Sequence, residues 1–278
     1  MTTLKEYADA RELTVNLTMR ELRGKYKRSL LGWSWSLLNP LATVVIFAIV
    51  FRFFLKVDAP RGDPSGLKNF ALFLVCGLLP WNYLSNGLNG AMLTVVGNAN
   101  LVKKVYFPRE ALVVSNVASW VYSLLIELGT MCIFFLIFGN MVLPWIPVVL
   151  GLILLQTIFV LGLALLLSAL NVYFRDIQHL FGIVLLGWFY ATPIVYPISL
   201  VVEADKTKPE LLGHQIPLLT LYRLNPMTRL VEAYRDVLYD LRFPPLVDVL
   251  YIFGCGVVML VIGWYVFNRL EGRMAEEL

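Results

Sequence analysis

The sequence predicts an all-α integral membrane protein with six transmembrane helices. Of its 278 residues, 59% are hydrophobic and only 15% are charged, whereas about a quarter of the residues in a soluble domain are charged. Six apolar runs reach the roughly 20 residues that cross about 30 Å of hydrocarbon. The expected spans are 32–55, 70–96, 111–138, 145–173, 180–200 and 247–267. Residues 32–278 would form this membrane domain, preceded by a separate helix within residues 1–31.

Residues 1–31 are too polar to cross a membrane, and they lack the apolar core of a cleavable signal peptide. Their apolar side chains recur at helical spacing, which predicts an amphipathic helix. These side chains are Val15, Met19, Leu22, Tyr26 and Leu30. Because the other positions carry several arginines and lysines, the helix suits the headgroup layer of the cytoplasmic leaflet. A helix packed against a partner protein explains the same pattern.

The first predicted span begins near Trp33 and Trp35, which suit the membrane interface, and Pro40 predicts a kink within it. Residues 57–68 combine prolines and glycines with mixed charges, which predicts an external loop. The second span returns the chain to the cytoplasmic side. Pro80 predicts that this second span is broken at mid-depth.

A short basic segment, residues 97–110, separates the second and third spans. Its cationic side chains are Lys103, Lys104 and Arg109. Positive charge next to a membrane span is retained on the cytoplasmic side, so this segment orients the protein. Tyr106, Phe107 and Pro108 add an apolar knob that is typical of a surface for a partner. Anchoring of these aromatic rings at the membrane interface is the alternative.

The polar segment between the fifth and sixth spans contains an amphipathic helix. Asn225 and Pro226 suit the cap and first position of this helix. Its apolar stripe consists of Met227, Leu230, Val231, Tyr234, Leu238 and Leu241. Asp236 and Asp240 fall on its polar face, and a shorter helix over 216–223 would precede it. Both helices are expected on the external side.

Six spans place both chain ends on the cytoplasmic side. The distribution of charge supports this orientation, because 13 of the 23 lysines and arginines fall in the predicted cytoplasmic segments. The other ten lie in or next to the two external loops, where nine acidic residues accompany them. Short loops decide orientation more strongly than long ones, which favours the same assignment.

Three stretches resemble the membrane subunit of a type-2 ABC exporter. They are R-G-K-Y-K-R-S-L-L-G-W-S-W-S-L-L-N-P-L at residues 23–41, L-V-K-K-V-Y-F-P-R-E at 101–110, and F-R-D-I-Q-H-L followed by A-T-P-I-V-Y-P within 174–197. L-N-P-M and E-A-Y-R-D follow further on. Together the stretches cover nearly the whole chain in order. They are most similar to the branch that exports polysaccharide, O-antigen or teichoic acid polymers on a lipid carrier.

The resemblance implies a homodimer in the bacterial inner membrane, bound to two copies of a separate ATP-binding subunit. The substrate would be a lipid-linked polysaccharide, and the protein would contact membrane lipid but no nucleic acid. The sequence agrees on one point, because it has no G-x-x-x-x-G-K-[ST] loop; Gly24 and Lys25 are followed by Tyr26. The chain is therefore expected to bind no cofactor and to be no enzyme by itself, with ATP and Mg on the partner subunit.

The resemblance also implies a contact with the ATPase subunit. The expected coupling residues are Leu101, Lys103, Lys104, Tyr106, Phe107, Arg109, Arg175 and Asp176. Phe107 is expected to contribute more than the lysines, because buried aromatic side chains dominate interfaces. Arg175 and Asp176 would form a second, smaller contact. A local salt bridge that caps the fifth span is the alternative for this pair.

Substrate sites follow from the same resemblance. The basic residues expected to receive an anionic headgroup, or alternatively anionic lipid, are Arg20, Arg23, Tyr26, Lys27 and Arg28. Aromatic platforms with amides suit sugar rings, although interfacial belts explain aromatic residues equally well. The expected path residues are Trp35, Trp81, Asn82, Tyr83, Trp120 and Tyr190. The expected external gate residues are Asn225, Tyr234 and Arg235.

Glu127 is the one acidic residue deep in a predicted span. An ionisable group there costs at least about 2.5 kcal/mol and is expected to face the protein interior. It would either line the path or form a structural hydrogen bond. An ion-coupled secondary transporter would use Glu127 as a relay, but the sequence shows no repeated half and no second buried charge to pair with it.

Two further alternatives to a polysaccharide exporter remain, a membrane enzyme and an exporter of a different substrate. A membrane enzyme acting on lipid-linked sugars would need clustered carboxylates, and the sequence has no D-D or D-x-D motif. An ABC exporter of a different lipid or drug fits the same motifs. Cys76, Cys132 and Cys255 lie in apolar runs without metal-ligand spacing, which indicates packing residues.

Overall fold

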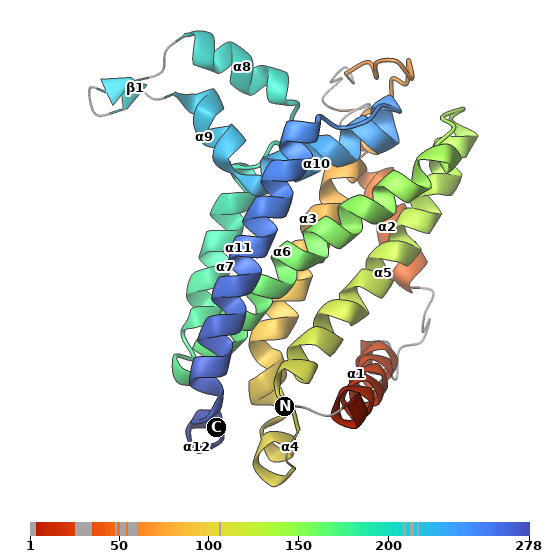
Figure 1. The fold of residues 1–278 in the computed structure, drawn as a ribbon. Coiled ribbons are helices and arrows are strands. Elements are labelled where there is room, and N and C mark those ends of the chain that lie inside the picture. Colours follow the sequence, from red (N-terminus) through yellow and green to blue (C-terminus); the bar gives the residue numbers. More distant parts are fainter. Residues whose placement is uncertain are drawn as a thin grey trace.

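The computed structural model describes residues 4–25, 35–47, 49–50, 54, 60–105, 107–207, 210–211, 214–215 and 217–278 (Figure 1). The elements in chain order are α1 (Leu4–Lys25), α2 (Trp35–Phe47), α3 (Phe70–Gly97), α4 (Ala99–Lys104), α5 (Glu110–Ile137), η3 (Leu143–Trp145), α6 (Ile146–Tyr173), α7 (Ile177–Tyr190), α8 (Ile198–Lys206), β1 (Glu210–Leu211), β2 (His214–Gln215), α9 (Leu218–Leu224), α10 (Pro226–Arg235), η4 (Asp236–Asp240), α11 (Leu246–Glu271) and α12 (Met274–Glu277). The strands are a two-residue antiparallel pair, so the predicted all-α class is confirmed.

Four of the described helices are long and apolar enough to cross a membrane. They are α3, α5, α6 with the preceding η3, and α11. Their bounds confirm the second, third, fourth and sixth predicted spans to within a few residues. The described part of the first predicted span contains α2, a helix of 13 residues, so the structure does not by itself establish six crossings.

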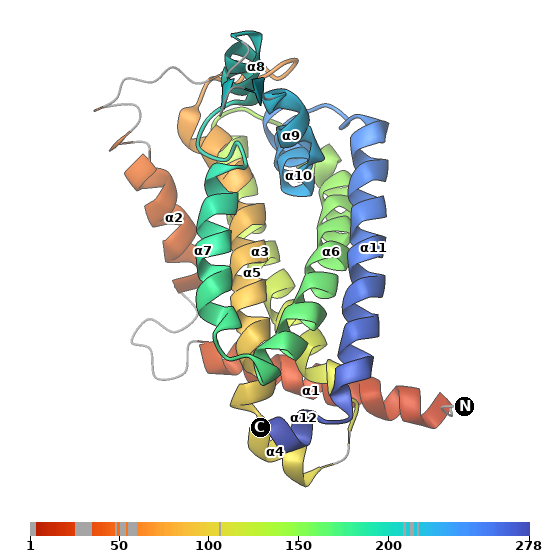
Figure 2. The same ribbon diagram turned by 90° about the vertical axis from the view of Figure 1, so that its left-hand side faces the viewer.

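The long helices form a bundle with two distinct ends (Figures 1 and 2). Helices α1, α4 and α12 and the turn between α6 and α7 lie at one end, called here the α4 end. Helices α8 and α9 and the strand pair lie at the opposite end, called the α9 end. The two loops predicted to be cytoplasmic therefore share one end of the molecule.

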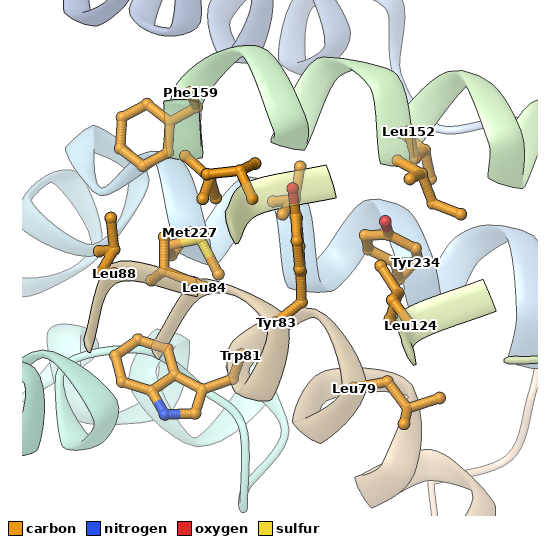
Figure 3. Packing of buried hydrophobic residues seen from close by; sticks show 14 of the residues in the cluster. Leu79, Trp81, Tyr83, Leu84, Leu88, Leu124, Leu152, Phe159, Met227 and Tyr234 are labelled. Carbon is orange, nitrogen blue, oxygen red and sulfur yellow. The ribbon is translucent and has the colours of Figure 1, made fainter. Parts of the chain in front are cut away.

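Helix α3 lies at the centre of the bundle. Within its apolar stretch 83% of the residues are buried, compared with 17% for α11 at the periphery. Figure 3 shows Tyr83 and Leu84 of α3 lying among Phe159 of α6 and Met227 and Tyr234 of α10. The amphipathic helix predicted near the external surface is thus packed into the core on the side chains of the central span.

Glycines bring α6 and α11 into direct backbone contact. A Cβ atom on Gly162 would lie 2.4 Å from the backbone nitrogen of Leu260, and one on Gly263 would lie 2.0 Å from the Gly162 carbonyl oxygen. Small residues allow such close approach, which contributes dispersion contacts where lipid removes most of the hydrophobic driving force. This crossing fixes the last span against the fourth.

The predicted break at Pro80 is wrong, because α3 runs without interruption from Phe70 to Gly97. The side chain of Gln156 on α6 donates a hydrogen bond of 2.7 Å to the Pro80 carbonyl oxygen. The carbonyl that the proline leaves without an intrahelical donor is that of Cys76, four residues earlier, so the bond from Gln156 ties α6 to α3 and does not replace the lost one.

The fifth predicted span, 180–200, is also wrong at its outer end. Helix α7 contains 14 residues and ends at Tyr190, so at 1.5 Å per residue it is only about 21 Å long. Residues 191–197 are irregular, and a separate helix, α8, begins at Ile198. Pro193 and Pro197 explain the change, because proline removes a backbone donor and disfavours helical geometry at the residue before it.

Helix α1 packs on α5 through a face that only partly coincides with the predicted stripe. Its buried apolar side chains are Leu17 and Leu22, and Leu13 packs partly against the core. Val15 and Met19 of the predicted stripe are exposed. Leu22 is the one described member of the predicted stripe that is buried, and Tyr26 and Leu30 lie outside the described residues.

Candidate functional site

Arg235 of α10 binds the irregular segment that follows α7. Its side chain is 3% exposed, and its Nη1 and Nη2 atoms donate hydrogen bonds of 2.6 and 2.7 Å to the carbonyl oxygens of Pro193 and Ile194. Nη1 also contacts Glu232 at 2.8 Å, and the guanidinium lies 3.8 Å from the centre of the Phe73 ring. Buried carbonyls without helical partners require donors. Arg235 supplies them from another element.

Asn225 supplies the second connection between α10 and this segment. Its Oδ1 atom accepts hydrogen bonds from the backbone N–H of Met227, at 3.0 Å, and from the indole of Trp188, at 2.8 Å. Its Nδ2 atom donates to the carbonyl of Ala191 and to the hydroxyl of Thr192. The predicted N-cap is confirmed, and the same side chain also links the end of α7 to the start of α10.

Gly77 on α3 leaves the space in which these groups meet. A Cβ atom at this position would lie 3.2 Å from Arg235 Nη2 and 3.4 Å from the Ile194 Cα atom. On the next face of α10, the Tyr234 hydroxyl donates to Gln156 Oε1 at 3.1 Å. The three predicted gate residues on α10 and at its start thus lie around one junction between α3, α6 and the interrupted fifth span.

The helix continues beyond α10 as η4. The environment of Asp236, its first residue, differs from the prediction. Asp236 is buried rather than on a solvated face, and Arg242 Nε donates to it at 2.7 Å. Burial raises the pKa of Asp236 to about 6, against the opposing effect of Arg242. Leu241 then ends the segment in the left-handed conformation, with φ of 63°.

At the α4 end, the predicted coupling residues are divided between the surface and the core. Lys103 and Lys104 are exposed. Leu101 and Phe107 pack partly against the core, and Val105, which the sequence analysis did not single out, is 52% exposed. Tyr106 lies outside the described residues.

Arg109 does not project freely from the basic segment. Its Nη1 atom donates to the carbonyl oxygen of Glu271, and its backbone N–H donates to Glu271 Oε1 at 3.4 Å. This residue therefore ties the segment to the end of α11. Arg175 and Asp176 are exposed in the α6–α7 turn, and Asp176 makes no side-chain hydrogen bond to cap α7.

The basic residues of α1 point in several directions. Arg20 donates a hydrogen bond of 2.8 Å to Asn98 at the start of α4, and Arg23 is exposed. Tyr26, Lys27 and Arg28 lie outside the described residues. The α1 helix is thus connected to the basic segment through a residue predicted to receive substrate.

The six predicted path residues differ in their exposure to solvent. Trp81 and Tyr83 are 5% and 2% exposed and belong to the core, where the Tyr83 hydroxyl donates to Thr157 at 3.0 Å. Their rings are enclosed by the core, and Tyr83 also borders the cleft between α3 and α5. Trp35, Asn82 and Tyr190 are exposed, and Trp120 is partly buried.

Lys25 covers one face of Trp120. Its ammonium nitrogen lies 3.4 Å from the centre of the indole ring and donates hydrogen bonds to the Ser119 carbonyl and the Ser123 hydroxyl, at 3.1 and 2.9 Å. Burial lowers the pKa of Lys25 to about 8, and the carboxylate of Glu127 opposes this effect. The statement that no second charge accompanies Glu127 is corrected here, because the sequence could not show that α1 folds back onto α5.

A cleft beside this lysine joins the central span to α5. It is lined by Asn82, Tyr83, Asn86, Trp120, Ser123, Leu124 and Glu127. Within the described residues there is no group of three or more metal-ligating side chains. The amides, hydroxyl and carboxyl group that line the cleft are hydrogen-bonding groups.

Comparison with known proteins places the chain in a family. Residues 12–205 match the family described as ABC-2 type transporter. The chain is 29% identical to an O-antigen export system permease protein RfbA from Myxococcus xanthus, over 99% of this chain and 98% of the relative. It is 28% identical to an RfbA protein from Klebsiella pneumoniae, over 96% and 95%. It is also 23% identical to the capsule polysaccharide export inner-membrane protein CtrC from Neisseria meningitidis, over 92% and 89%. The predicted resemblance is confirmed: the chain belongs to the ABC-2 type transporter family.

Proposed function

We propose that this chain is the transmembrane subunit of an ATP-driven exporter that moves a lipid-linked polysaccharide, of the O-antigen, galactan or teichoic acid type, across the bacterial inner membrane. The observation that carries the proposal is similarity over nearly the full length to permeases named for O-antigen export. A relative named for capsule polysaccharide export supports the same substrate class.

Energy for transport would come from a separate ATP-binding subunit, present in two copies on a homodimer of this chain. The sequence has no phosphate-binding loop of its own, so ATP and Mg would be bound by that partner. The α4 end is the expected docking side, because Lys103, Lys104 and Val105 are exposed there and the α6–α7 turn lies at the same end. This end, with both chain termini, would face the cytoplasm.

The opposite end would contain the exit. The α7–α8 segment has no continuous helix and depends on α10 for hydrogen bonds. A transmembrane path can be closed by such a segment without a permanent plug, because irregular backbone at membrane depth is tolerated where protein or a water-filled cavity surrounds it. Asn225, Tyr234 and Arg235 would hold this gate in place.

A second function is favoured by one observation, the electrostatic interaction between Lys25 at the end of α1 and Glu127 of α5. Buried ionisable groups of this kind also serve as proton relays in ion-coupled transporters. The lack of a repeated half in the sequence argues against that mechanism, so ATP-driven export is the preferred function.

The test is reconstitution of the chain in proteoliposomes, with and without the ATP-binding polypeptide that co-purifies with it. Export of a lipid-diphosphate-linked O-antigen polysaccharide that requires both ATP and the second polypeptide supports the proposal. Transport driven by a proton gradient with this chain alone would establish the ion-coupled mechanism instead. ATP-dependent transport of other lipids or drugs, but not of the polysaccharide, would contradict the substrate class.

A further inference from the structure

The last turn of α11 accepts hydrogen bonds from side chains of two other parts of the bundle. The final four carbonyl groups of a helix have no partner within that helix. In α11 the Glu271 carbonyl oxygen accepts a hydrogen bond from Nη1 of Arg109, and the Leu270 carbonyl oxygen accepts one of 2.8 Å from the Tyr173 hydroxyl. The backbone N–H of Arg273 also donates to Leu270, at 3.2 Å. Two consecutive residues at the end of the last span are therefore tied to distant segments.

Both donors lie at the base of a connection at the α4 end. Arg109 immediately precedes the first residue of α5 and so closes the basic segment, residues 97–110. Tyr173 is the last residue of α6, and the α6–α7 turn begins directly after it. The two connections are far apart in the sequence. They meet because each is bonded to the end of α11.

Helix α12 adds an apolar contact to the same arrangement. It packs on both α4 and α6, and Figures 1 and 2 show it beside α4. Met274, its first residue, is completely buried and belongs to the core. A buried side chain in close contact with its neighbours fixes their separation. Residues 270–274, called here the C-terminal bracket, thus contact both connections at once.

A fixed position of the two connections matters for any protein that docks on both. Lys103 and Lys104 are exposed on α4, and Arg175 and Asp176 are exposed in the α6–α7 turn. Binding to two surface segments costs less conformational entropy when their relative position is set beforehand. The bracket provides this position without occupying the exposed side chains themselves.

We infer that the C-terminal bracket holds the two connections as one preformed docking unit for the ATP-binding subunit, with Arg109 and Tyr173 as positioning residues. This inference rests on the proposed function and deepens it. It assigns Arg109 a different role from the direct contact expected from the sequence, because its guanidinium acts through Glu271. Tyr173 and Met274 were not among the predicted coupling residues.

The first test measures positioning in the chain itself, by amide hydrogen exchange and mass spectrometry in detergent. Tyr173→Phe removes the hydroxyl and keeps the ring. Exchange over residues 99–105 should become several-fold faster, because loosening the bracket on the α6 side also releases α4. A merely local bond would change exchange near residues 173 and 270 alone.

Tyr251→Phe is the matched control. The Tyr251 hydroxyl donates a hydrogen bond of 2.7 Å to the carbonyl oxygen of Leu224, the last residue of α9, at the opposite end of the molecule. Each variant therefore loses one bond from a tyrosine to the end of a helix. Tyr251→Phe should leave exchange over residues 99–105 unchanged.

The second test measures binding of the ATP-binding polypeptide that co-purifies with the chain, using the chain in lipid nanodiscs. Tyr173→Phe should raise the Kd by about two- to tenfold, the range expected for the loss of one hydrogen bond. Tyr251→Phe should leave the Kd unchanged. Arg109→Gln should also raise it.

The double variant distinguishes positioning from direct contact. Loss of either tie already separates the two connections, so Arg109→Gln with Tyr173→Phe should raise the Kd by less than the product of the two single effects. If Arg109 touched the ATP-binding subunit directly, the two effects would multiply.

Three outcomes would overturn the inference. One is exchange over residues 99–105 that is the same in Tyr173→Phe and Tyr251→Phe. Another is an unchanged Kd in Tyr173→Phe, and the third is a double variant whose single effects multiply. Failure of the proposed function is distinguishable, because the unsubstituted chain would then bind no ATP-binding polypeptide, whereas the exchange comparison needs no partner.

Discussion

The Nη1 atom of Arg235 lies 2.6 Å from the carbonyl oxygen of Pro193, in a part of the chain where helix α7 has already ended. The Nη2 atom of the same guanidinium donates a hydrogen bond to the carbonyl oxygen of Ile194. An arginine on α10 therefore takes over the hydrogen bonding that a continuous fifth helix would have provided for itself. The relationship couples the interrupted span to α10 and, through Gly77, to the central span.

Replacing Arg235 by glutamine should destabilise the protein by roughly 2–5 kcal/mol, because two buried carbonyls lose charged donors. The thermal unfolding midpoint in detergent measures this change. Arg223→Gln, at an exposed position of α9, is the matched control and should change stability by no more than about 0.5 kcal/mol. Equal midpoints for the two variants would show that Arg235 does not hold the segment.

Gly263→Ala should destabilise the crossing of α6 and α11 by roughly 1–3 kcal/mol, because the added methyl group meets the Gly162 backbone and forces the helices apart. Gly254→Ala in the same helix meets no atom within 4 Å and should be neutral or slightly stabilising. Urea or thermal unfolding of the two variants gives the comparison. A Gly263→Ala protein as stable as Gly254→Ala would contradict the close crossing.

Lys25 should titrate well below an ordinary lysine. Burial lowers its pKa from 10.5 to about 8, so the unfolded chain binds this proton more tightly than the folded chain. The contribution of this group to stability therefore increases as pH rises from about 8 toward 10.5. Competitive acylation of the folded protein at several pH values, read by mass spectrometry, measures the pKa.

Glu127→Gln should lower the pKa of Lys25 further, because the carboxylate favours the charged ammonium. Peptides that contain the exposed Lys103 and Lys104 provide the reference reactivity in the same digest. If the Lys25 pKa does not move in the glutamine variant, the two groups do not interact as the structure indicates.

Phe107→Ala should reduce substrate-stimulated ATPase activity of the complex more than Lys103→Ala or Lys104→Ala does, because a large apolar side chain contributes more to an interface than an exposed lysine. Since Phe107 also packs partly against the core, the unfolding midpoint of each variant has to be measured as well. Val105→Ala tests the neighbouring exposed apolar position. Full stimulation and export by a folded Phe107→Ala complex would remove this residue from the coupling contact.

The sequence by itself determined the class of the protein and most of its helices. Apolar length defines a membrane span because each helix satisfies its own backbone hydrogen bonds, so α3, α5, α6 and α11 could be predicted from local composition. The cap at Asn225 is equally local, since its side chain bonds to Met227 two positions away. The motifs that resemble a type-2 ABC exporter were also contiguous stretches of sequence.

Tertiary structure alone decided where the fifth span ends, whether Pro80 breaks α3, and which charge accompanies Glu127. The first and the last depend on a partner distant in the chain: Arg235 for residues 193 and 194, and Lys25 for Glu127. Hydropathy reports the preference of a segment for lipid or water. It does not report which distant donor satisfies a backbone carbonyl, because that depends on how the helices pack.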